Sequence, residues 1–259
     1  MKKSLTLLAS MALTAATTFA EIQTKTIEYQ AGGTTCEGVF VTDSLLMNRG
    51  PAVLIAHQWK GLTDYEKKRA EMLVKLGYKV LCADVYGKGV RADNPQDAGK
   101  LAGKYKGDRP LLRERINAAL TTLKQQPGVD TNKLAAIGYC FGGTTVLELA
   151  RSGANLKGVI SFHGGLGSPT PDDARNIKCK VVAHHGADDP FVPADEVAGF
   201  EKEMRDAKVD WQLTSHGGAV HSFTDWNAGN DHSKGAAYNE KADQRSWAAM
   251  KGFLEELFK

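Results

Sequence analysis

The feature of this 259-residue sequence that most constrains its fold is the pentapeptide Gly138-Tyr139-Cys140-Phe141-Gly142. An apolar run typical of a buried strand precedes it, and a run with helical character follows it. A turn that joins a strand to a helix so tightly leaves no room for Cβ atoms on either side, which explains a glycine at each end. The turn strains the central residue and directs helix N–H groups toward it. We interpret Cys140 as a nucleophile; on these residues alone, the alternative is a buried structural cysteine.

The composition is that of a globular enzyme, with 42% hydrophobic and 24% charged residues. The formal net charge is +3, and both signs are mixed along the chain. This pattern gives no sign of nucleic-acid binding or of a membrane-binding surface. We find no internal repeat, linker or low-complexity segment, and we expect a single domain over residues 21–259.

Residues 1–20 have the pattern of a secretory signal peptide. Lys2 and Lys3 form a basic start, residues 5–16 are largely apolar, and Thr18-Phe19-Ala20 places small residues where signal peptidase requires them. The segment is too short for a membrane anchor, and no cysteine follows it directly. We therefore expect cleavage after about Ala20 and a periplasmic or secreted protein without a membrane anchor.

Four cysteines are present, at positions 36, 82, 140 and 179. An oxidising compartment permits disulfides. However, Cys82 and Cys179 lie in apolar, strand-like runs, where a buried free thiol is expected. The sequence leaves the state of Cys36 open.

Strand-like and helix-like segments alternate along the chain, which predicts an α/β fold with a mostly parallel central sheet and helices on both faces. Residues 22–29 and 36–42, on either side of Ala31-Gly32-Gly33, predict an antiparallel hairpin at the sheet edge. Residues 85–107 are rich in glycine, lysine and aspartate, and we expect an irregular excursion that shapes a substrate pocket. The other expected strands are 51–57, 78–84, 134–137, 156–162, 179–184 and 211–215, and the main expected helices are 63–76, 110–125, 194–207 and 239–258.

A nucleophile in such a fold needs an acid and a histidine, in that order along the chain. Asp189, which precedes Pro-Phe-Val-Pro, follows an expected parallel strand, and ligand sites form at the carboxyl ends of such strands. His221 lies on a glycine-rich loop after the last strand. We prefer Asp189 to Asp188, which we interpret as a turn or surface residue, and His221 to His216, which we expect to end the strand.

The remaining histidines give weaker signals. His184 and His185, near two aspartates, could suggest a metal site, but they lack a regular spacing of ligands. We therefore expect neither a metal nor a cofactor. His57, His163 and His232 have no surrounding constellation, so we interpret them as satisfied polar or surface residues.

Five segments in this order resemble the dienelactone hydrolase family across nearly the whole mature length. They are His57-Gln58-Trp59-Lys60-Gly61, Ala83-Asp84-Val85-Tyr86-Gly87, residues 138–143, residues 186–193 and His221-Ser222-Phe223. The resemblance implies an α/β-hydrolase fold and a Cys140–His221–Asp189 catalytic triad. It also implies an oxyanion hole formed by the backbone N–H groups of Trp59 and Phe141, and it places Tyr86 at the substrate pocket.

The sequence departs from the family pattern at three positions of the expected substrate pocket. Gln58 stands where the family has a glutamate that controls cysteine protonation, and glutamine cannot take a proton. Lys88 and Asp225 stand where two family arginines hold the substrate carboxylate. A lysine still binds a carboxylate as a point charge, whereas an aspartate repels it. We therefore do not expect a strong preference for anionic dienelactones.

The sequence predicts a secreted, cysteine-dependent hydrolase of small-molecule esters or lactones that acts through a thioester intermediate. An acyltransferase or peptidase with the same triad is one alternative. A non-catalytic secreted binding protein with the same fold is another, and the altered pocket residues motivate it. We expect a monomer or weak homodimer with no nucleic-acid partner.

Overall fold

The computed structural model describes residues 21–46 and 48–259, so the expected signal peptide lies outside the described residues. These residues build one eight-stranded sheet in the order β1-β2-β4-β3-β5-β6-β7-β8. Strands β1 (Ile22–Ala31) and β2 (Thr34–Asp43) form the predicted edge hairpin, and β2 pairs antiparallel with β4. The pairs from β4 to β8 are all parallel. The predicted α/β fold with a mostly parallel sheet is confirmed.

The inner parallel strands β3, β4 and β6 are short apolar runs, as expected for strands covered on both faces, whereas β8 at the sheet edge is more polar and partly exposed. Each parallel strand was predicted from the sequence to within a few residues, apart from the long N-terminal extension of β5. Their bounds are β3 (Gly50–Ala56), β4 (Lys79–Ala83), β5 (Val129–Tyr139), β6 (Gly158–Phe162), β7 (Lys180–Gly186) and β8 (Trp211–His216).

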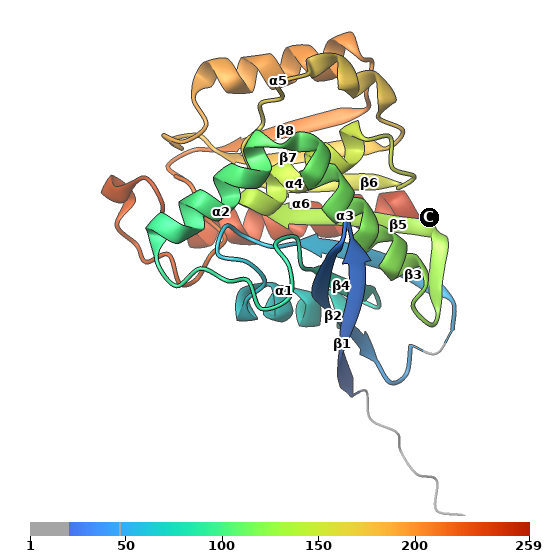
Figure 1. Cartoon of the computed structure of the whole chain (residues 1–259). Coiled ribbons are helices and arrows are strands. Elements are labelled where there is room, and N and C mark those ends of the chain that lie inside the picture. The colour runs from blue at the N-terminus through green and yellow to red at the C-terminus, as the bar shows by residue number, and fades with distance from the viewer. Residues whose placement is uncertain (1–20, 47) are drawn as a thin grey trace, which may run out of the picture.

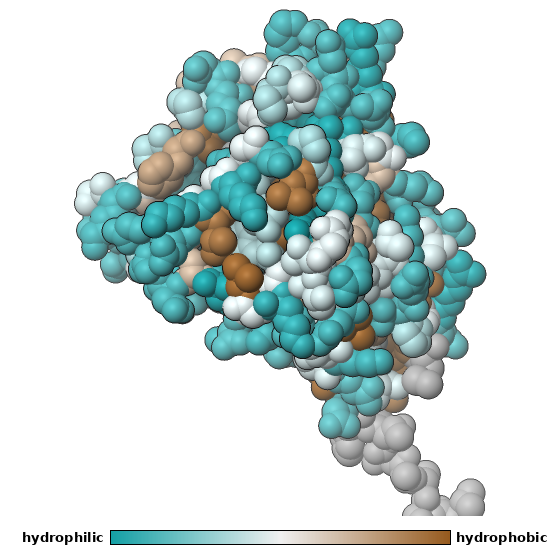
Figure 2. All heavy atoms as spheres, viewed as in Figure 1, coloured by the Kyte–Doolittle hydropathy of each residue, from teal (hydrophilic) through white to brown (hydrophobic). Residues whose placement is uncertain are grey.

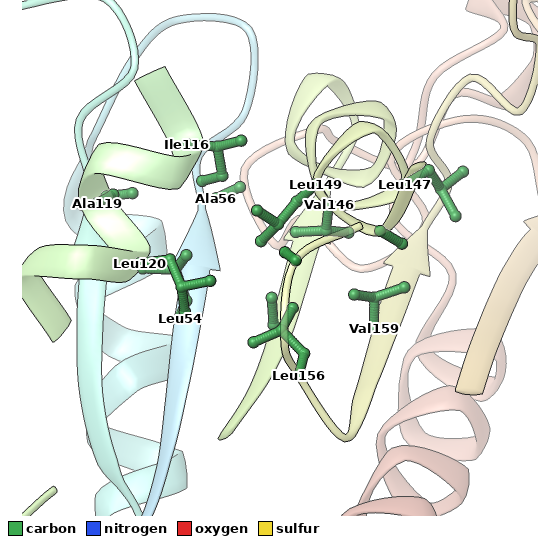
Figure 3. Packing of buried hydrophobic residues seen from close by; sticks show 14 of the residues in the cluster. Leu54, Ala56, Ile116, Ala119, Leu120, Val146, Leu147, Leu149, Leu156 and Val159 are labelled. Atoms are coloured by element: carbon green, nitrogen blue, oxygen red, sulfur yellow. The ribbon is translucent and has the colours of Figure 1, made fainter. Parts of the chain in front are cut away.

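Helices cover both faces of the sheet (Figure 1). On one face, α3 (Arg109–Lys124), α4 (Phe141–Arg151) and α5 (Ala194–Asp206) share a large core with the strands. Figure 3 shows this core, with side chains of α3 facing β3 and side chains of α4 above β6. On the other face, α1 (Asp64–Val74) and α6 (Glu240–Phe258) pack on a second core.

The start of α1 shows how closely local sequence determines local structure. Thr63 and Glu66 form a capping box, in which the Glu66 carboxylate accepts from the Thr63 amide at 2.8 Å. The other Glu66 oxygen accepts from the Gln58 amide at 3.0 Å, although Glu66 is fully buried. The cap of α1 therefore also fixes the loop that follows β3.

The expected irregular excursion over residues 85–107 is partly wrong, because its second half is helix α2 (Pro95–Gly107). Asn94 caps this helix by accepting from the Asp97 amide at 2.9 Å, and Pro95 occupies its first turn. Ala98, Ala102 and Tyr105 form its buried stripe. Glycines and lysines on the exposed side hid this short apolar stripe from sequence analysis.

The four cysteines at positions 36, 82, 140 and 179 are all free thiols in the structure. Cys36, Cys82 and Cys179 are buried, and Cys140 is half-buried. The expectation of free thiols at Cys82 and Cys179 is confirmed, and Cys36 does not pair with any of the other three.

The surface seen in Figure 2 is mainly hydrophilic, with hydrophobic residues in small separate patches. No helix over residues 21–46 and 48–259 is long and apolar enough to cross a membrane. The carboxyl ends of the parallel strands lie at one edge of the sheet, where α/β proteins form their ligand sites. The residues selected from the sequence lie on the loops at this edge.

Candidate active site

Cys140 lies at a sharp turn, which we call the elbow, between β5 and α4. Its backbone has φ 56° and ψ −117°, a left-handed conformation that is uncommon for a residue with a side chain. A Cβ atom on Gly138 would lie 1.9 Å from the Gly142 carbonyl oxygen. A Cβ atom on Gly142 would lie 2.1 Å from the Ala56 carbonyl oxygen. Both glycines are therefore required by close backbone contacts, as the sequence predicted.

The structure brings the three residues of the predicted triad together. His221 Nε2 lies 3.1 Å from Cys140 Sγ, and His221 Nδ1 lies 2.7 Å from Asp189 Oδ2. The other carboxylate oxygen of Asp189 accepts from the Phe191 amide at 2.8 Å. The imidazole therefore bridges the thiol and a carboxylate whose orientation is fixed by the backbone.

The charges in this group favour a thiolate–imidazolium pair. Burial would raise the pKa of the Cys140 thiol, but the positive charge and hydrogen bond of His221 oppose this effect, and the net pKa is lowered. The Phe141 amide and the Lys106 ammonium lower it further. Burial would lower the pKa of His221, but the Cys140 thiolate and Asp189 raise it to about 10. A thiolate beside a charged imidazole is a ready nucleophile near neutral pH.

The alternatives that we ranked lower lie elsewhere. Asp188 is exposed, whereas Asp189 is buried. His216 is the last residue of β8, as expected, and its Nε2 lies 3.4 Å from His184 Nδ1. Neither Asp188 nor His216 contacts the thiol–imidazole pair.

The residues around position 236 hold the loop that carries His221. The His221 amide donates to the Gly235 carbonyl at 3.1 Å, and the Ala237 amide donates to the His221 carbonyl at 3.0 Å. The exposed Phe191 ring packs edge-on against the imidazole, with ring centroids 5.5 Å apart. His221 is thus fixed by its backbone and covered on one side.

Two backbone amides, from residues that line the same cavity as Cys140, are candidates for an oxyanion hole. The Phe141 amide is at the N-terminus of α4, next to Cys140, and it lowers the pKa of the Cys140 thiol. Trp59 follows β3, the neighbouring strand of the sheet, and its amide has no acceptor among the described residues. These amides are the pair that the family resemblance implied.

A cavity of about 430 Å³ opens over this group, and Trp59, Phe141, Phe191 and Lys106 line it with Cys140 and His221. This volume suits a small organic molecule. A side pocket of about 380 Å³ adjoins it and shares Trp59, Ser222 and Ala236 with it. We call the two spaces the catalytic cavity and the side pocket.

Of the four predicted substrate-pocket residues, Gln58 and Asp225 line the side pocket. Gln58 Nε2 donates to Asp225 Oδ2 at 3.0 Å, so each side chain satisfies part of the other's hydrogen-bonding capacity. Tyr86 does not line either space. Its ring packs beneath Phe141, and its hydroxyl donates to the Trp59 carbonyl at 3.0 Å. Tyr86 therefore supports the Trp59 loop from below.

The expected place of Lys88 in the substrate pocket is not supported. Its ammonium group bonds to the Glu28 carboxylate and lies 3.6 Å from the Glu37 carboxylate. Both glutamates belong to the edge hairpin, which draws the lysine away from the cavity. Lys106 of α2 lines the catalytic cavity instead. We missed it because we expected no helix there.

Two histidines that we interpreted as ordinary polar residues are fully buried beside the site. The Cys140 amide donates to His163 Nδ1 at 3.1 Å as well as to the Phe162 carbonyl at 3.0 Å. His57 Nδ1 lies 2.6 Å from the Gln58 carbonyl oxygen. Each histidine directly follows the apolar run of a buried strand, and that position was the available signal.

No group of three or more His, Cys, Asp or Glu side chains within residues 21–46 and 48–259 is arranged to hold a metal ion. His184 and His185, considered above as metal ligands, are both buried on β7. Burial lowers the pKa of His184 to about 3, so it stays neutral.

The sheet order, the strained elbow and the site at the carboxyl ends of the strands define an α/β-hydrolase. The dienelactone hydrolase family model matches residues 38–258, and the chain belongs to that family. It is a hydrolase by fold and by family.

Known proteins that resemble the chain agree with this assignment. A crystal structure of a dienelactone hydrolase-like promiscuous phosphotriesterase from metagenomic libraries is 42% identical, with a TM-score of 0.88. The match covers 92% of this chain and 99% of that one. The carboxymethylenebutenolidase of Pseudomonas putida is 27% identical over 150 residues, which cover 56% of this chain and 63% of that protein. The dienelactone hydrolase of Anabaena variabilis, 21% identical over 77% of this chain and 88% of its own, shares the fold with a TM-score of 0.59.

We predict that iodoacetamide alkylates Cys140 rapidly at pH values where an ordinary cysteine is still protonated. In His221→Ala, the imidazolium no longer lowers the pKa of the thiol, while burial still raises it. The pH at half-maximal alkylation should therefore rise toward or beyond the ordinary value of about 8.5. Mass spectrometry of the peptide that contains Cys140 measures the rate and separates it from the three buried thiols.

The matched control is His216→Ala, which removes a histidine that does not contact the thiol. Its alkylation profile should follow that of the wild type. A His221→Ala profile that coincides with the wild type would contradict the ion-pair interpretation.

Proposed function

We propose that the protein is a cysteine-dependent hydrolase of small-molecule esters or lactones. The observation that carries this proposal is the continuous chain of contacts from Cys140 through His221 to Asp189, beside a cavity that Trp59 and Phe141 also line. The family includes proteins that are named as lactone hydrolases, such as the carboxymethylenebutenolidase of Pseudomonas putida. The same arrangement supplies a nucleophile, a base and an oxyanion site.

In the first half of the proposed reaction, the Cys140 thiolate attacks the acyl carbon of the substrate. The carbonyl oxygen becomes an oxyanion that accepts from the Trp59 and Phe141 amides. One such donor is typically worth about 3–4 kcal/mol in the transition state. His221 then donates its Nε2 proton to the leaving oxygen, and the C–O bond breaks to give a thioester on Cys140.

In the second half, neutral His221 takes a proton from water, and the resulting hydroxide attacks the thioester. The same two amides hold the second oxyanion. Collapse of this intermediate breaks the C–S bond, releases the carboxylic acid and restores the thiolate–imidazolium pair. Asp189 keeps the imidazole in the tautomer that these steps need.

The glutamate of the family pattern has no counterpart in this cycle. Gln58 is occupied with Asp225 in the side pocket, and His221 is the group that hydrogen-bonds to Cys140 Sγ. We therefore propose that His221, the Phe141 amide and Lys106 keep Cys140 deprotonated, without a carboxylate that exchanges protons with the thiol.

We predict that Cys140→Ala, His221→Ala and Asp189→Asn each lose most of the turnover of a p-nitrophenyl ester. Removal of a member of such a triad typically costs a factor of about 10⁴ or more. Cys140→Ser should recover little, because a serine hydroxyl is much harder to ionise than a thiol. Steady-state kinetics on folded variants, verified by circular dichroism, provide the measurement.

The matched controls are Asp188→Asn and His216→Ala, which should stay within a few-fold of the wild type. A greater loss of turnover in His216→Ala than in His221→Ala would refute the assignment of the base.

Stoichiometric labelling of Cys140 without ester turnover would favour the binding-protein alternative. Product transfer to an added alcohol or amine in preference to water would favour an acyltransferase. A screen of esters, lactones, peptides and phosphotriesters then defines the substrate class.

The charge of Asp225 bears on the choice of substrate. The carboxylate lines the side pocket, where the family pattern has an arginine for the substrate carboxylate. Lys88, the other expected cation, is held by the edge hairpin. We propose that the side pocket does not receive an anionic group.

We predict that Asp225→Asn raises the ratio of kcat/KM for an anionic ester to that for a neutral ester of the same shape. Loss of one negative charge in a partly enclosed pocket should change the ratio by about threefold to tenfold. Asp206→Asn, at an exposed position on α5, is the control and should leave the ratio unchanged. An unchanged ratio in Asp225→Asn would show that the substrate does not approach this carboxylate.

We also propose that the protein is exported and that its leader is removed after Ala20. The support is the pattern of basic, apolar and small residues over positions 2–20. Expressed in a Gram-negative host, the protein should be found in the periplasmic fraction with Glu21 as its first residue. Ala20→Arg should block cleavage and leave a longer, membrane-associated chain. A cytoplasmic protein that retains Met1 would refute the proposal.

A further inference from the structure

We propose that His57 is a positioning residue for the oxyanion hole. Its imidazole holds the Gln58–Trp59 peptide so that the Trp59 amide faces the reacting carbonyl oxygen. The inference rests on the proposed function, because it concerns the amide that would bind the oxyanion. His57 directly follows β3, is fully buried and does not contact Cys140 Sγ.

The contacts of the imidazole fix its tautomer. The Val85 amide can only donate, and it lies 3.2 Å from His57 Nε2, so this nitrogen must be the unprotonated acceptor. The proton of the neutral ring is then on Nδ1, which donates to the Gln58 carbonyl oxygen at 2.6 Å. Burial lowers the pKa of His57 to about 4, so the ring keeps this arrangement near neutral pH.

The geometry of the peptide bond transmits this contact to the active site. In a trans peptide, the C=O and N–H groups point in opposite directions. The carbonyl that His57 holds and the amide assigned to the oxyanion hole belong to the same peptide, between Gln58 and Trp59. Fixing the oxygen on the imidazole turns the amide away from it, toward the cavity that Trp59 lines.

Neighbouring contacts limit rotation of this peptide. The Gly61 amide donates to the same Gln58 carbonyl at 3.2 Å, and the Tyr86 hydroxyl donates to the Trp59 carbonyl at 3.0 Å. The Gly61 amide ties the Gln58 carbonyl only to another residue of the same loop. The imidazole ties it to the sheet, because the other ring nitrogen accepts from the Val85 amide, just after β4.

His57 also lies against the second oxyanion donor. Its ring stacks on that of Phe141, with centroids 5.7 Å apart and 26° between the planes. The first turn of α4 also lies close to the end of β3, because a Cβ atom on Gly142 would lie 2.8 Å from the His57 carbonyl oxygen. One buried ring therefore contacts the segments that supply both amides.

Two substitutions separate the donor at Nδ1 from the acceptor at Nε2. In His57→Asn, the side-chain amide nitrogen can take the place of Nδ1 and donate to the Gln58 carbonyl. In His57→Gln, the longer side chain places its amide near Nε2, where it can satisfy the Val85 amide but not the Gln58 carbonyl. We expect His57→Asn to keep kcat within about threefold of the wild type and His57→Gln to lose about 10²-fold, the typical effect of losing one oxyanion donor. KM should change little in either variant.

Alkylation of Cys140 by iodoacetamide provides the second readout, because this reaction needs the thiolate but forms no oxyanion. Its rate and pH dependence should match the wild type in both variants. His184→Gln is the matched control. It changes another buried histidine near a strand end, one that bonds to His216 rather than to the oxyanion loop, and its kcat should stay within about twofold. His57→Leu, which also lacks the donor, replaces His57→Gln if that variant does not fold.

Several results would overturn the proposal. They are wild-type turnover in the donor-free variant, equal losses in His57→Asn and His57→Gln, and a loss of alkylation that parallels the loss of turnover. The last result would mean that His57 acts through the fold or the thiolate. Wild-type ester turnover, measured in the same assay, tests the proposed function separately from these differences between variants.

Discussion

The active site depends on one close backbone contact, the approach of the elbow to the end of β3. The Gly142 carbonyl occupies the place that a Cβ atom on Gly138 would take, and the Ala56 carbonyl occupies the place that a Cβ atom on Gly142 would take. This crowding forces Cys140 into its left-handed conformation and raises the thiol above the sheet edge. The strain at one residue is held by the strand pairing on both sides, because β5 lies between β3 and β6. A rigid sheet therefore keeps the nucleophile in a conformation that an isolated turn would not hold.

The electrostatics of the site follow from this placement. A buried thiol would normally be harder to ionise, and a buried imidazole harder to protonate. Here the two groups lie 3.1 Å apart, and each charged form stabilises the other. Asp189 adds a second negative charge behind the ring, and the Phe141 amide and Lys106 also lower the pKa of the thiol. The ion pair is thus supported on both sides by groups from other strands and helices.

Charged side chains of both signs lie around the catalytic cavity and the side pocket. Asp225, bonded to Gln58, lies on the side-pocket side, whereas Lys106 of α2 lines the catalytic cavity itself. Lys88 pairs with acidic residues of the edge hairpin and lines neither space. Two buried histidines contact the backbone of the site. His57 hydrogen-bonds to the Gln58 carbonyl, and His163 accepts from the Cys140 amide.

The sequence alone determined the elbow, the order of nucleophile, acid and histidine, and most of the strands and helices. These features depend on neighbouring residues, such as glycines that a tight turn requires and apolar runs that a covered strand requires. Only the tertiary structure showed that α2 forms, that Lys88 turns toward the hairpin while Lys106 lines the cavity, and that His57 and His163 hold the backbone of the site. A side chain's partner is set by segments distant in the sequence. The direction of a lysine or the tautomer of a histidine is therefore decided when the strands and helices pack.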